Sequence, residues 1–209
     1  LWTVHPTDGS TPRIEWVRHV GPAVWIGEAA LDYYEATGQA DYLTFATDIG
    51  TYVKDDINHR SGGIAMGAQD QTLATAATAE AAMAAAQEKI AQIEMQTGME
   101  IPAEWIETVT VKQGVGAAAV EQVQAVIPWT RIYSTEHNID YANFAARLVA
   151  AGQPQFAAEQ AGAEAWLLTG AQGFKAYEHA DVGENRLLRG AKWADTAGAG
   201  VPDPVAQWA

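Results

Sequence analysis

The feature of this sequence that most constrains its fold is a repeated junction between two predicted helices. Residues 36–43, Ala-Thr-Gly-Gln-Ala-Asp-Tyr-Leu, correspond to residues 150–157, Ala-Ala-Gly-Gln-Pro-Gln-Phe-Ala, at an offset of 114 residues. In both copies a helix is expected to end at Gly-Gln, and a second helix begins with an aromatic residue at the same position. A chance match stays open, but the shared helix–Gly-Gln–helix context favours two related α-hairpins that share a core.

Apolar residues at helical spacing predict a pair of helices around each junction. The first hairpin is expected to span residues 22–37 and 40–57, and the second residues 135–151 and 154–169. Pro22 suits the first helical position, because proline has no N–H to leave unpaired there. The loops are so short that the two helices of each hairpin should be antiparallel neighbours.

The stretch between the two hairpins has a different composition. Residues 71–97 are rich in alanine, which favours one long helix, and residues 116–127 also predict a helix. Residues 101–113 contain valines separated by threonine, which favours a short strand. For the remaining segments, the pattern predicts a short extended stretch in 1–20, a further helix in 171–180, and loops or short strands in 183–204.

The charge balance restricts the ligands that this protein can bind. The 209 residues include 26 aspartates and glutamates but only 12 lysines and arginines, which gives a net charge of −14. Nucleic acid is therefore an unfavourable partner, and neutral or cationic substrates fit better. The chain has no cysteine, so disulfides and cysteine-based metal or catalytic sites are excluded. No segment is apolar enough to predict a membrane span.

Polar functional groups are concentrated at the predicted start of the second hairpin, in residues 134–141, Ser-Thr-Glu-His-Asn-Ile-Asp-Tyr. Ser134 or Thr135 can cap the first turn with its hydroxyl. Glu136 and Asp140 are four residues apart and share one helix face, with Cβ atoms roughly 5–6 Å apart. Two carboxylates, an imidazole and an amide at one helix end exceed what a surface helix needs, and they predict a pocket.

Four sequence elements occur in an order that resembles a known class of proteins. They are Gly-Pro-Ala-Val-Trp-Ile at 21–26, Glu-Ala-Thr-Gly at 35–38, Gly-Gly-Ile-Ala-Met-Gly at 62–67 and Ser-Thr-Glu-His-Asn-Ile-Asp at 134–140. Together they resemble bacterial six-hairpin glycosidase-like proteins, the (α/α)6 toroids. The resemblance covers residues 14–70 and 129–170. It implies an all-α fold in which antiparallel helical hairpins form part of a toroid, with a few short strands in loops. It also implies carbohydrate substrates and paired catalytic carboxylates in a cleft at one end.

Two departures from this class affect the expected domain organisation. The stretch 71–127 has no counterpart there, and it is expected to be an alanine-rich helical insertion in one toroid-like domain of residues 1–209. The sequence also predicts only about half the helices of a full ring. Either the remainder of the toroid belongs to a longer chain, or a partner such as a second copy supplies it. Both ends, at Leu1 and Ala209, are expected to be cuts.

Paired carboxylates are the groups that glycoside hydrolysis requires, one to protonate the leaving oxygen and one as base or nucleophile. Glu136 is the first candidate for the base or nucleophile, because the positive end of the helix dipole stabilises an anion. Asp140, Asp70 and Glu28 are candidates for the acid, which needs surroundings such as an apolar wall to raise its pKa. Acidic residues are favoured in the first turn of any helix, so a structural role stays open for Glu136 and Asp140.

Other residues are candidates for binding the sugar. His137 and Asn138 have groups that can bind hydroxyls, and Gly63 lies in the glycine-rich segment, where the backbone can approach a ligand closely. The aromatic candidates for stacking on sugar rings are Trp25, Trp129, Tyr133 and Trp193. The alternatives are core packing for each aromatic ring, a structural hydrogen bond for His137 and a flexible turn for the glycine-rich segment.

The sequence therefore predicts a carbohydrate-active protein, secreted or periplasmic, with a glycoside hydrolase as the leading interpretation. The first alternative is a non-catalytic helical scaffold or carbohydrate-binding component of a larger assembly. The second is a polysaccharide lyase or sugar epimerase, in which Tyr133 or His137 would be the base and Arg131 would supply positive charge. No cofactor or metal is expected, since Asp-Asp-Ile-Asn at 55–58 lacks the spacing of a calcium loop and no histidine pair has zinc spacing.

Overall fold

The computed structural model describes residues 19–60, 62–97, 101–113, 119–168, 176–179, 184–187, 190–192 and 206–208. These residues form two compact units. Unit 1 contains the described residues up to Ala68 and from Trp129 onward, and unit 2 contains Gln69–Pro128. Among the helices described, none has the length and apolar character needed to cross a membrane.

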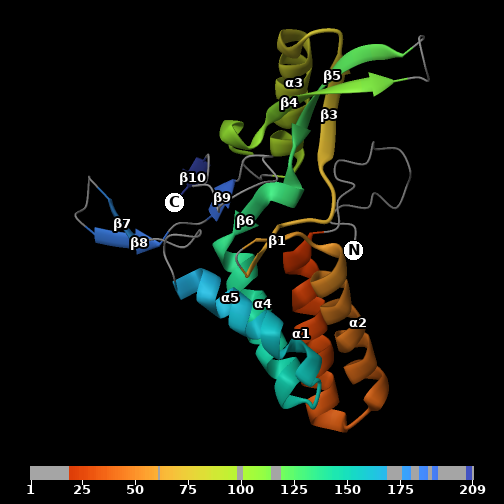
Figure 1. Cartoon of the computed structure of the whole chain (residues 1–209), viewed down its shortest axis with the longest axis vertical. Helices are drawn as coiled ribbons and strands as arrows, with labels where there is room; N and C mark the ends of the chain where they lie inside the picture. Colours follow the sequence, from red (N-terminus) through yellow and green to blue (C-terminus); the bar gives the residue numbers. More distant parts are fainter. Residues whose placement is uncertain are drawn as a thin grey trace. The chain divides into compact units, whose positions relative to one another are not determined.

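Unit 1 is built from the two predicted α-hairpins (Figure 1). Its α-helices are α1 (Val20–Thr37), α2 (Ala40–Asp56), α4 (Thr135–Ala150) and α5 (Ala157–Leu168). The first helices of the two hairpins, α1 and α4, contact each other as a central pair. In addition, α2 packs against α1 and α5 packs against α4. A short 3-10 helix, η4 (Pro154–Phe156), leads into α5.

Both hairpin turns contain a glycine in the left-handed conformation, as the repeat predicted. Gly38 follows α1 with φ of 70°, and Gly152 follows α4 with φ of 85°. The Gly38 N–H donates to the carbonyl of Tyr34 (2.7 Å), and the Gly152 N–H donates to that of Val149 (3.0 Å). These bonds satisfy carbonyls at the ends of the helices that have no partner within the helix. The helix–Gly-Gln–helix junction is therefore confirmed in both copies.

Side-chain hydrogen bonds show that α1 and α4 are parallel and in register. Three bonded pairs connect them: Trp25–Asp140, Glu28–Asn143 and Asp32–Arg147, each 115 residues apart. The difference between the two residue numbers is the same in all three pairs, so the two helices run in the same direction. In an antiparallel pair the sum of the two residue numbers would be constant instead. The N-termini of α1 and α4 therefore lie at the same end of unit 1.

The core of unit 1 is filled by aromatic side chains that pack against glycines. Its largest fully buried side chains are Trp166, Tyr141, Phe144 and Phe156. A Cβ at Gly27 would lie only 2.5 Å from the ring of Phe144, and a Cβ at Gly50 would lie 2.9 Å from the ring of Phe156. The glycines therefore let the helices approach each other closely enough for these rings to fill the interior.

Short strands connect and flank the helices of unit 1. They are β1 (His59–Arg60), β2 (Gly63–Ile64), β6 (Ile132–Ser134), β7 (Ala176–His179), β8 (Glu184–Leu187), β9 (Gly190–Lys192) and β10 (Ala206–Trp208). They form antiparallel pairs β1–β2 and β7–β8 and a small antiparallel sheet of order β10-β9-β6. A 3-10 helix, η3 (Trp129–Arg131), precedes β6.

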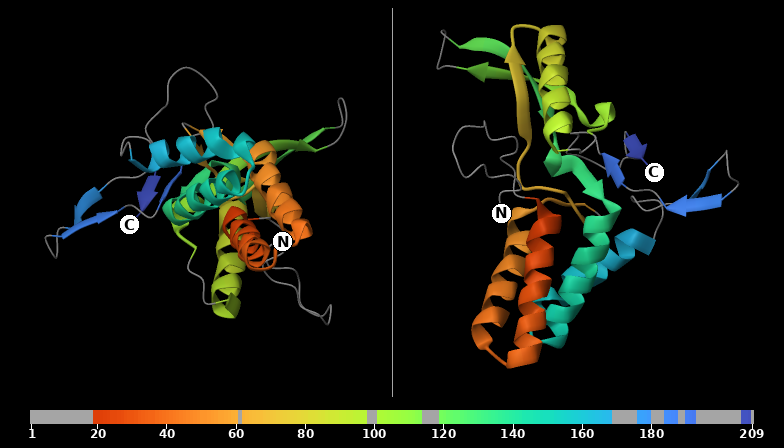
Figure 2. Two further views of the ribbon diagram at one scale, coloured as in Figure 1. Left: turned by 90° about the horizontal axis from the view of Figure 1, so that it is seen from below. Right: turned by 180° about the vertical axis from the view of Figure 1, so that it is seen from behind.

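Unit 2 is an antiparallel sheet with one helix packed on it (Figure 2). Its elements are β3 (Gln71–Ala76), α3 (Ala79–Thr97), the 3-10 helix η1 (Ala103–Trp105), β4 (Glu107–Gln113) and β5 (Val120–Ile127). The strand order is β3-β5-β4, with β5 in the centre. The buried stripe of α3 consists of Ala82, Ala86, Ile90 and Ile93. Small alanines in this stripe allow the helix to lie close to the strands.

The expected all-α toroid is wrong, because the protein is of mixed α and β structure. The predicted helix 71–97 begins with a strand, β3, and only its second part, α3, is helical. The predicted helix 116–127 contains the central strand β5, while the strand expected in 101–113 is confirmed as β4. Valines spaced three apart in β5 imitate helical periodicity, but pairing with strands on both sides decides its structure.

The C-terminal predictions are confirmed only in part. The helix expected in 171–180 is wrong, because residues 176–179 form strand β7. Short strands in 183–204 are confirmed by β8 and β9. The extended segment expected in 1–20 lies outside the described residues up to position 18.

Candidate functional site

The glycine-rich segment, residues 62–67, lies against the starts of the two central helices, α1 and α4. The Met66 N–H donates to the carbonyl of Ile132 in β6 (2.7 Å), and the Val20 N–H in the first turn of α1 donates to the carbonyl of Met66 (2.9 Å). An isolated antiparallel bridge pairs Gly67 with His19, the residue before α1. Since β6 leads directly into α4, the motifs that the sequence singled out come together at one end of unit 1.

Asn138 holds this segment against α4 with its side-chain amide. Its Oδ1 accepts a hydrogen bond from the Ile64 N–H (2.8 Å), and its Nδ2 donates to the carbonyls of Ile64 (3.1 Å) and Ser134 (2.7 Å). The side chain is fully buried. The amide therefore pairs with both backbone groups of Ile64, as a neighbouring strand would, and the hydrogen bonds described for it are to the protein backbone.

Replacing Asn138 with alanine is expected to destabilise the protein by about 2–3 kcal/mol, because the buried N–H and C=O of Ile64 would both lose a partner. Denaturant titration of the full chain measures this change. Asn143→Ala, which removes an exposed amide bonded to Glu28 (2.6 Å), is the matched control and should cost only about 0.5 kcal/mol. Equal losses in the two variants would show that Asn138 has no special structural role.

His137 is a buried imidazole in the first turn of α4. Burial, and secondly the nearby His19, lower the pKa of His137 from 6.5 to about 4. Its Nδ1 has no hydrogen-bond partner in the described part of the chain. A Cβ at Gly21, in the first turn of α1, would collide with the His137 ring, so the imidazole lies directly against the start of α1. At neutral pH this side chain is therefore uncharged, and it occupies the junction between the two helices.

The two candidate carboxylates lie one turn apart on α4. Ser134 is the N-cap, and its Oγ accepts a hydrogen bond from the His137 N–H (3.5 Å). Glu136 is exposed in the first turn of the helix. Asp140 is half-buried, and its Oδ2 accepts a hydrogen bond from Nε1 of Trp25 on α1 (2.7 Å). The Trp25 side chain is nonetheless 49% exposed, so its orientation is fixed while much of the ring faces solvent.

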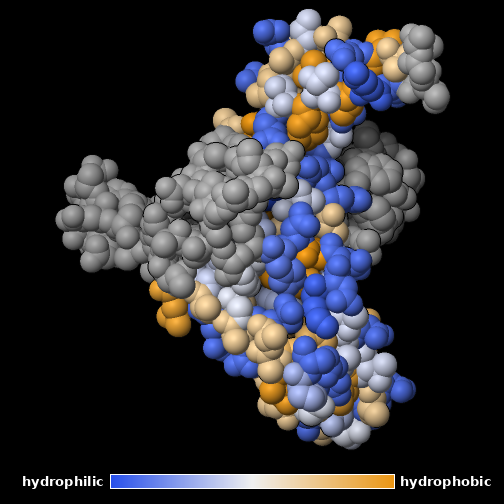
Figure 3. All heavy atoms as spheres, viewed as in Figure 1, coloured by the Kyte–Doolittle hydropathy of each residue, from blue (hydrophilic) through white to orange (hydrophobic). Residues whose placement is uncertain are grey.

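A row of polar pairs continues from Trp25 along the contact between α1 and α4, and we call it the α1–α4 seam. Its members are Trp25, Glu28, Asp32 and Glu35 on α1, and Asp140, Asn143 and Arg147 on α4. Arg147 bonds to Asp32 (2.6 Å) and to Glu35 (3.0 Å). Figure 3 shows a mixture of hydrophilic and hydrophobic side chains over the helical part of unit 1 on the side in view. The seam is thus a surface rich in carboxylates with one indole at its end.

The remaining predicted site residues have other environments. Trp129 and Tyr133 are buried, and the Tyr133 hydroxyl donates to the carbonyl of Asn58 (3.5 Å). Gly63 is buried below Trp166, whose indole Nε1 would lie 2.5 Å from a Cβ at that position. Asp70 is exposed and belongs to unit 2. Arg131 is half-buried in η3, and Trp193 lies outside the described residues.

Sequence reasoning did not identify the pairing of Trp25 with Asp140. It named both residues, but for separate roles. Their contact could not be predicted, because it depends on how two helices 115 residues apart in the sequence pack against each other. The repeat offset of 114 residues was the one signal that pointed to it. The offset indicated two related hairpins that share a core, but it did not show which of their helices lie side by side or in which direction they run.

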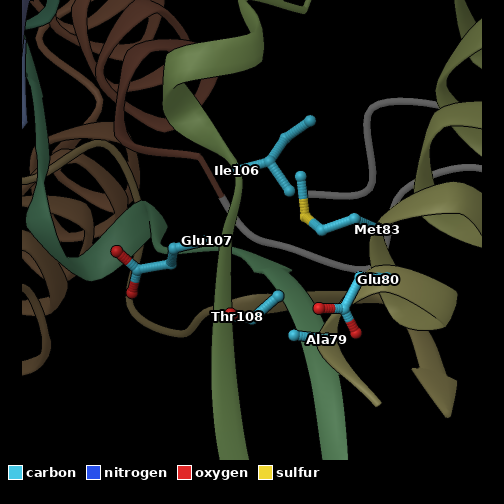
Figure 4. Close-up of a pocket in the computed structure, with 6 residues that line it drawn as sticks. All are labelled: Ala79, Glu80, Met83, Ile106, Glu107 and Thr108. Atoms are coloured by element: carbon cyan, nitrogen blue, oxygen red, sulfur yellow. The ribbon is translucent and has the colours of Figure 1, made fainter.

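Unit 2 has a shallow hollow of its own, between the start of α3 and β4 (Figure 4). It has a volume of about 590 Å³ and is lined by Ala79, Glu80, Met83, Ile106, Glu107 and Thr108. Met83 and Ile106 point toward each other, Glu80 lies beside Thr108, and Glu107 points away on the other side of β4. Across the described ranges of both units, no group of three or more His, Asp and Glu residues could hold a metal ion.

Comparison of the chain with known protein families, with curated proteins and with solved structures finds no match. The geometry of the seam and the chemistry of its side chains are therefore the basis for assigning a function.

Proposed function

We propose that this protein binds carbohydrate on the α1–α4 seam, with the indole of Trp25 as the stacking platform. The observation that supports this most directly is the orientation of Trp25. The ring is about half exposed, and its N–H is held by Asp140 at 2.7 Å. An exposed indole normally loses conformational entropy when a ligand orders it, and one that is already held in place loses less.

The groups around Trp25 suit the two surfaces of a sugar ring. The C–H face of a sugar packs on an aromatic plane, and its hydroxyls donate hydrogen bonds to acceptors at the side. Asp140 and Glu136 supply such carboxylate acceptors within one turn of α4. The net charge of −14 favours neutral or cationic sugars over uronic acids or sulfated chains.

Glycoside hydrolysis at this site is a second candidate function, and the pair of carboxylates supports it. In this proposal Glu136, which is exposed in the first turn of α4, is the base or nucleophile, and Asp140 is its partner. Trp25 would then position the sugar ring beside the carboxylates by stacking on it.

Binding is tested by isothermal titration of the full chain with neutral, cationic and acidic oligosaccharides. Trp25→Ala is expected to weaken binding by about tenfold or more, because it removes the stacking surface. The matched control is Tyr33→Ala, which removes another exposed aromatic ring of α1, one that packs on Tyr42 at 4.3 Å. Equal affinity of wild type and Trp25→Ala for every oligosaccharide that binds, or no binding at all, would contradict the proposal.

Hydrolysis is tested separately, by reducing-sugar release from the same oligosaccharides. Glu136→Gln keeps the shape of the side chain and removes its charge, so release should fall by about a hundredfold or more if this carboxylate is catalytic. Binding without release in the wild type would exclude hydrolysis and leave the binding proposal intact.

A further inference from the structure

Strand β4 forms an edge of the unit 2 sheet. In the order β3-β5-β4 its inner side pairs with β5 over all seven residues, and no described strand pairs with its outer side. The opposite edge, β3, is interrupted by a register shift between Thr72 and Ala74. Irregularities of this kind protect an edge from further pairing, whereas a regular strand rich in Val and Thr is a template for it.

We propose that two copies of this chain associate through β4, antiparallel and centred on Thr110, to form one continuous six-stranded sheet. The sequence of β4 is complementary to itself in this register. Val109 lies opposite Val111 of the second copy, Thr108 opposite Lys112, and Glu107 opposite Gln113. No charge meets a like charge, and the central positions bring β-branched residues together.

The two-fold axis of this arrangement is perpendicular to the sheet, so each side chain meets one on the same face. Thr108 lies on the face that carries α3, because it lines the hollow next to Glu80 (Figure 4). Lys112 of the second copy would therefore point into the same area and reach Glu80. Lys112 is free to do so, because its own ion pair with Glu121 (3.6 Å) is highly exposed and holds it only weakly. The second copy thereby adds a cation beside Glu80 at the edge of the hollow.

The same geometry explains why association would stop at two copies. A two-fold pairing uses each β4 edge once, and the sheet then ends on both sides at β3. The register shift in β3 disfavours addition of a further strand there.

The proposal is tested by sedimentation equilibrium of the full chain, with the wild type expected to have the mass of two chains. Thr110→Lys places two lysines opposite each other at the two-fold axis and should weaken the dimer by about tenfold, as should Thr110→Glu. An equimolar mixture of these two variants should dimerise again, because unlike charges then meet. Thr75→Lys, at an exposed position on the β3 edge, is the matched control and should remain dimeric.

Cysteine scanning tests the register, and the absence of native cysteine makes its result clear. Thr110→Cys should form a covalent dimer under mild oxidation, because the two equivalent positions face each other, and Thr75→Cys should not. A monomeric wild type at every concentration overturns the proposal, and so does a dimer that Thr110→Lys leaves unchanged. A dimer that Thr110→Cys fails to cross-link overturns the register.

Discussion

Replacing Gly62 with alanine is expected to cost about 4 kcal/mol of stability, because the added methyl group meets both backbone strain and a steric clash. Gly62 has φ of 90°, which side chains with a Cβ rarely adopt. A Cβ at this position would also collide with the backbone carbonyl of Gly162 in α5. A backbone group cannot rotate away as a flexible side chain can, so the segment before β2 would have to separate from α5.

Gly38→Ala separates the two causes of this loss. Gly38 has a similar φ of 70°, but a Cβ there would meet nothing within 4 Å. Its replacement should therefore cost only the conformational part, about 1 kcal/mol. Urea denaturation of both variants, followed by circular dichroism, gives the comparison. Similar losses for Gly62→Ala and Gly38→Ala would show that the contact with α5 contributes nothing.

The stability of the protein is expected to fall by about 3 kcal/mol through His137 alone as the pH is lowered from about 6.5 to about 4. In the unfolded chain this imidazole has its ordinary pKa of 6.5, and in the folded protein burial lowers the pKa to about 4. Between these values the unfolded state binds a proton and the folded state does not. Lowering the pH therefore favours unfolding in this window. Below about pH 4, His137 causes no further loss of stability.

His137→Gln isolates this effect from that of other groups that titrate in the same range. The variant has no imidazole at position 137, so its stability should decrease less steeply over this window. Urea denaturation at a series of pH values measures the difference between the two proteins. A second measurement follows the ring protons of His137 by NMR, which should change only near pH 4. A His137 that titrates near pH 6.5 in the folded protein would rule out the burial argument.

The hairpins could be predicted from the sequence because their signals are local. A glycine in the left-handed conformation, an N-cap serine and apolar residues at helical spacing depend only on near neighbours, and both junctions and the Ser134 cap are as expected. Strands β3 and β5 could not be predicted in the same way. Their residues suit a helix locally, and they become strands because they pair across about 50 positions of sequence.

The candidate site shows the same limit. The sequence identified where polar groups concentrate, but it could not show which of them are directed inward. Asn138 and His137 are buried and Glu136 is exposed, although all three lie in the first turns of one helix. Which side of α4 faces the core depends on α1 and on the glycine-rich segment. The exposure of Trp25, on which the proposed function depends, is likewise a property of the packed helices.

The backbone hydrogen bond from Gly67 to Trp129 (3.3 Å) has a consequence for the order of folding. Both residues belong to unit 1 and flank the stretch Gln69–Pro128 of unit 2, so the polypeptide leaves and re-enters unit 1 at neighbouring points. If unit 2 forms first, the sixty residues of Gln69–Pro128 behave as a link of only a few residues. The entropy cost of closing that loop then falls by about 2 kcal/mol. Early formation of the sheet in unit 2 would thus accelerate the docking of α4 against α1, although that contact lies entirely within unit 1.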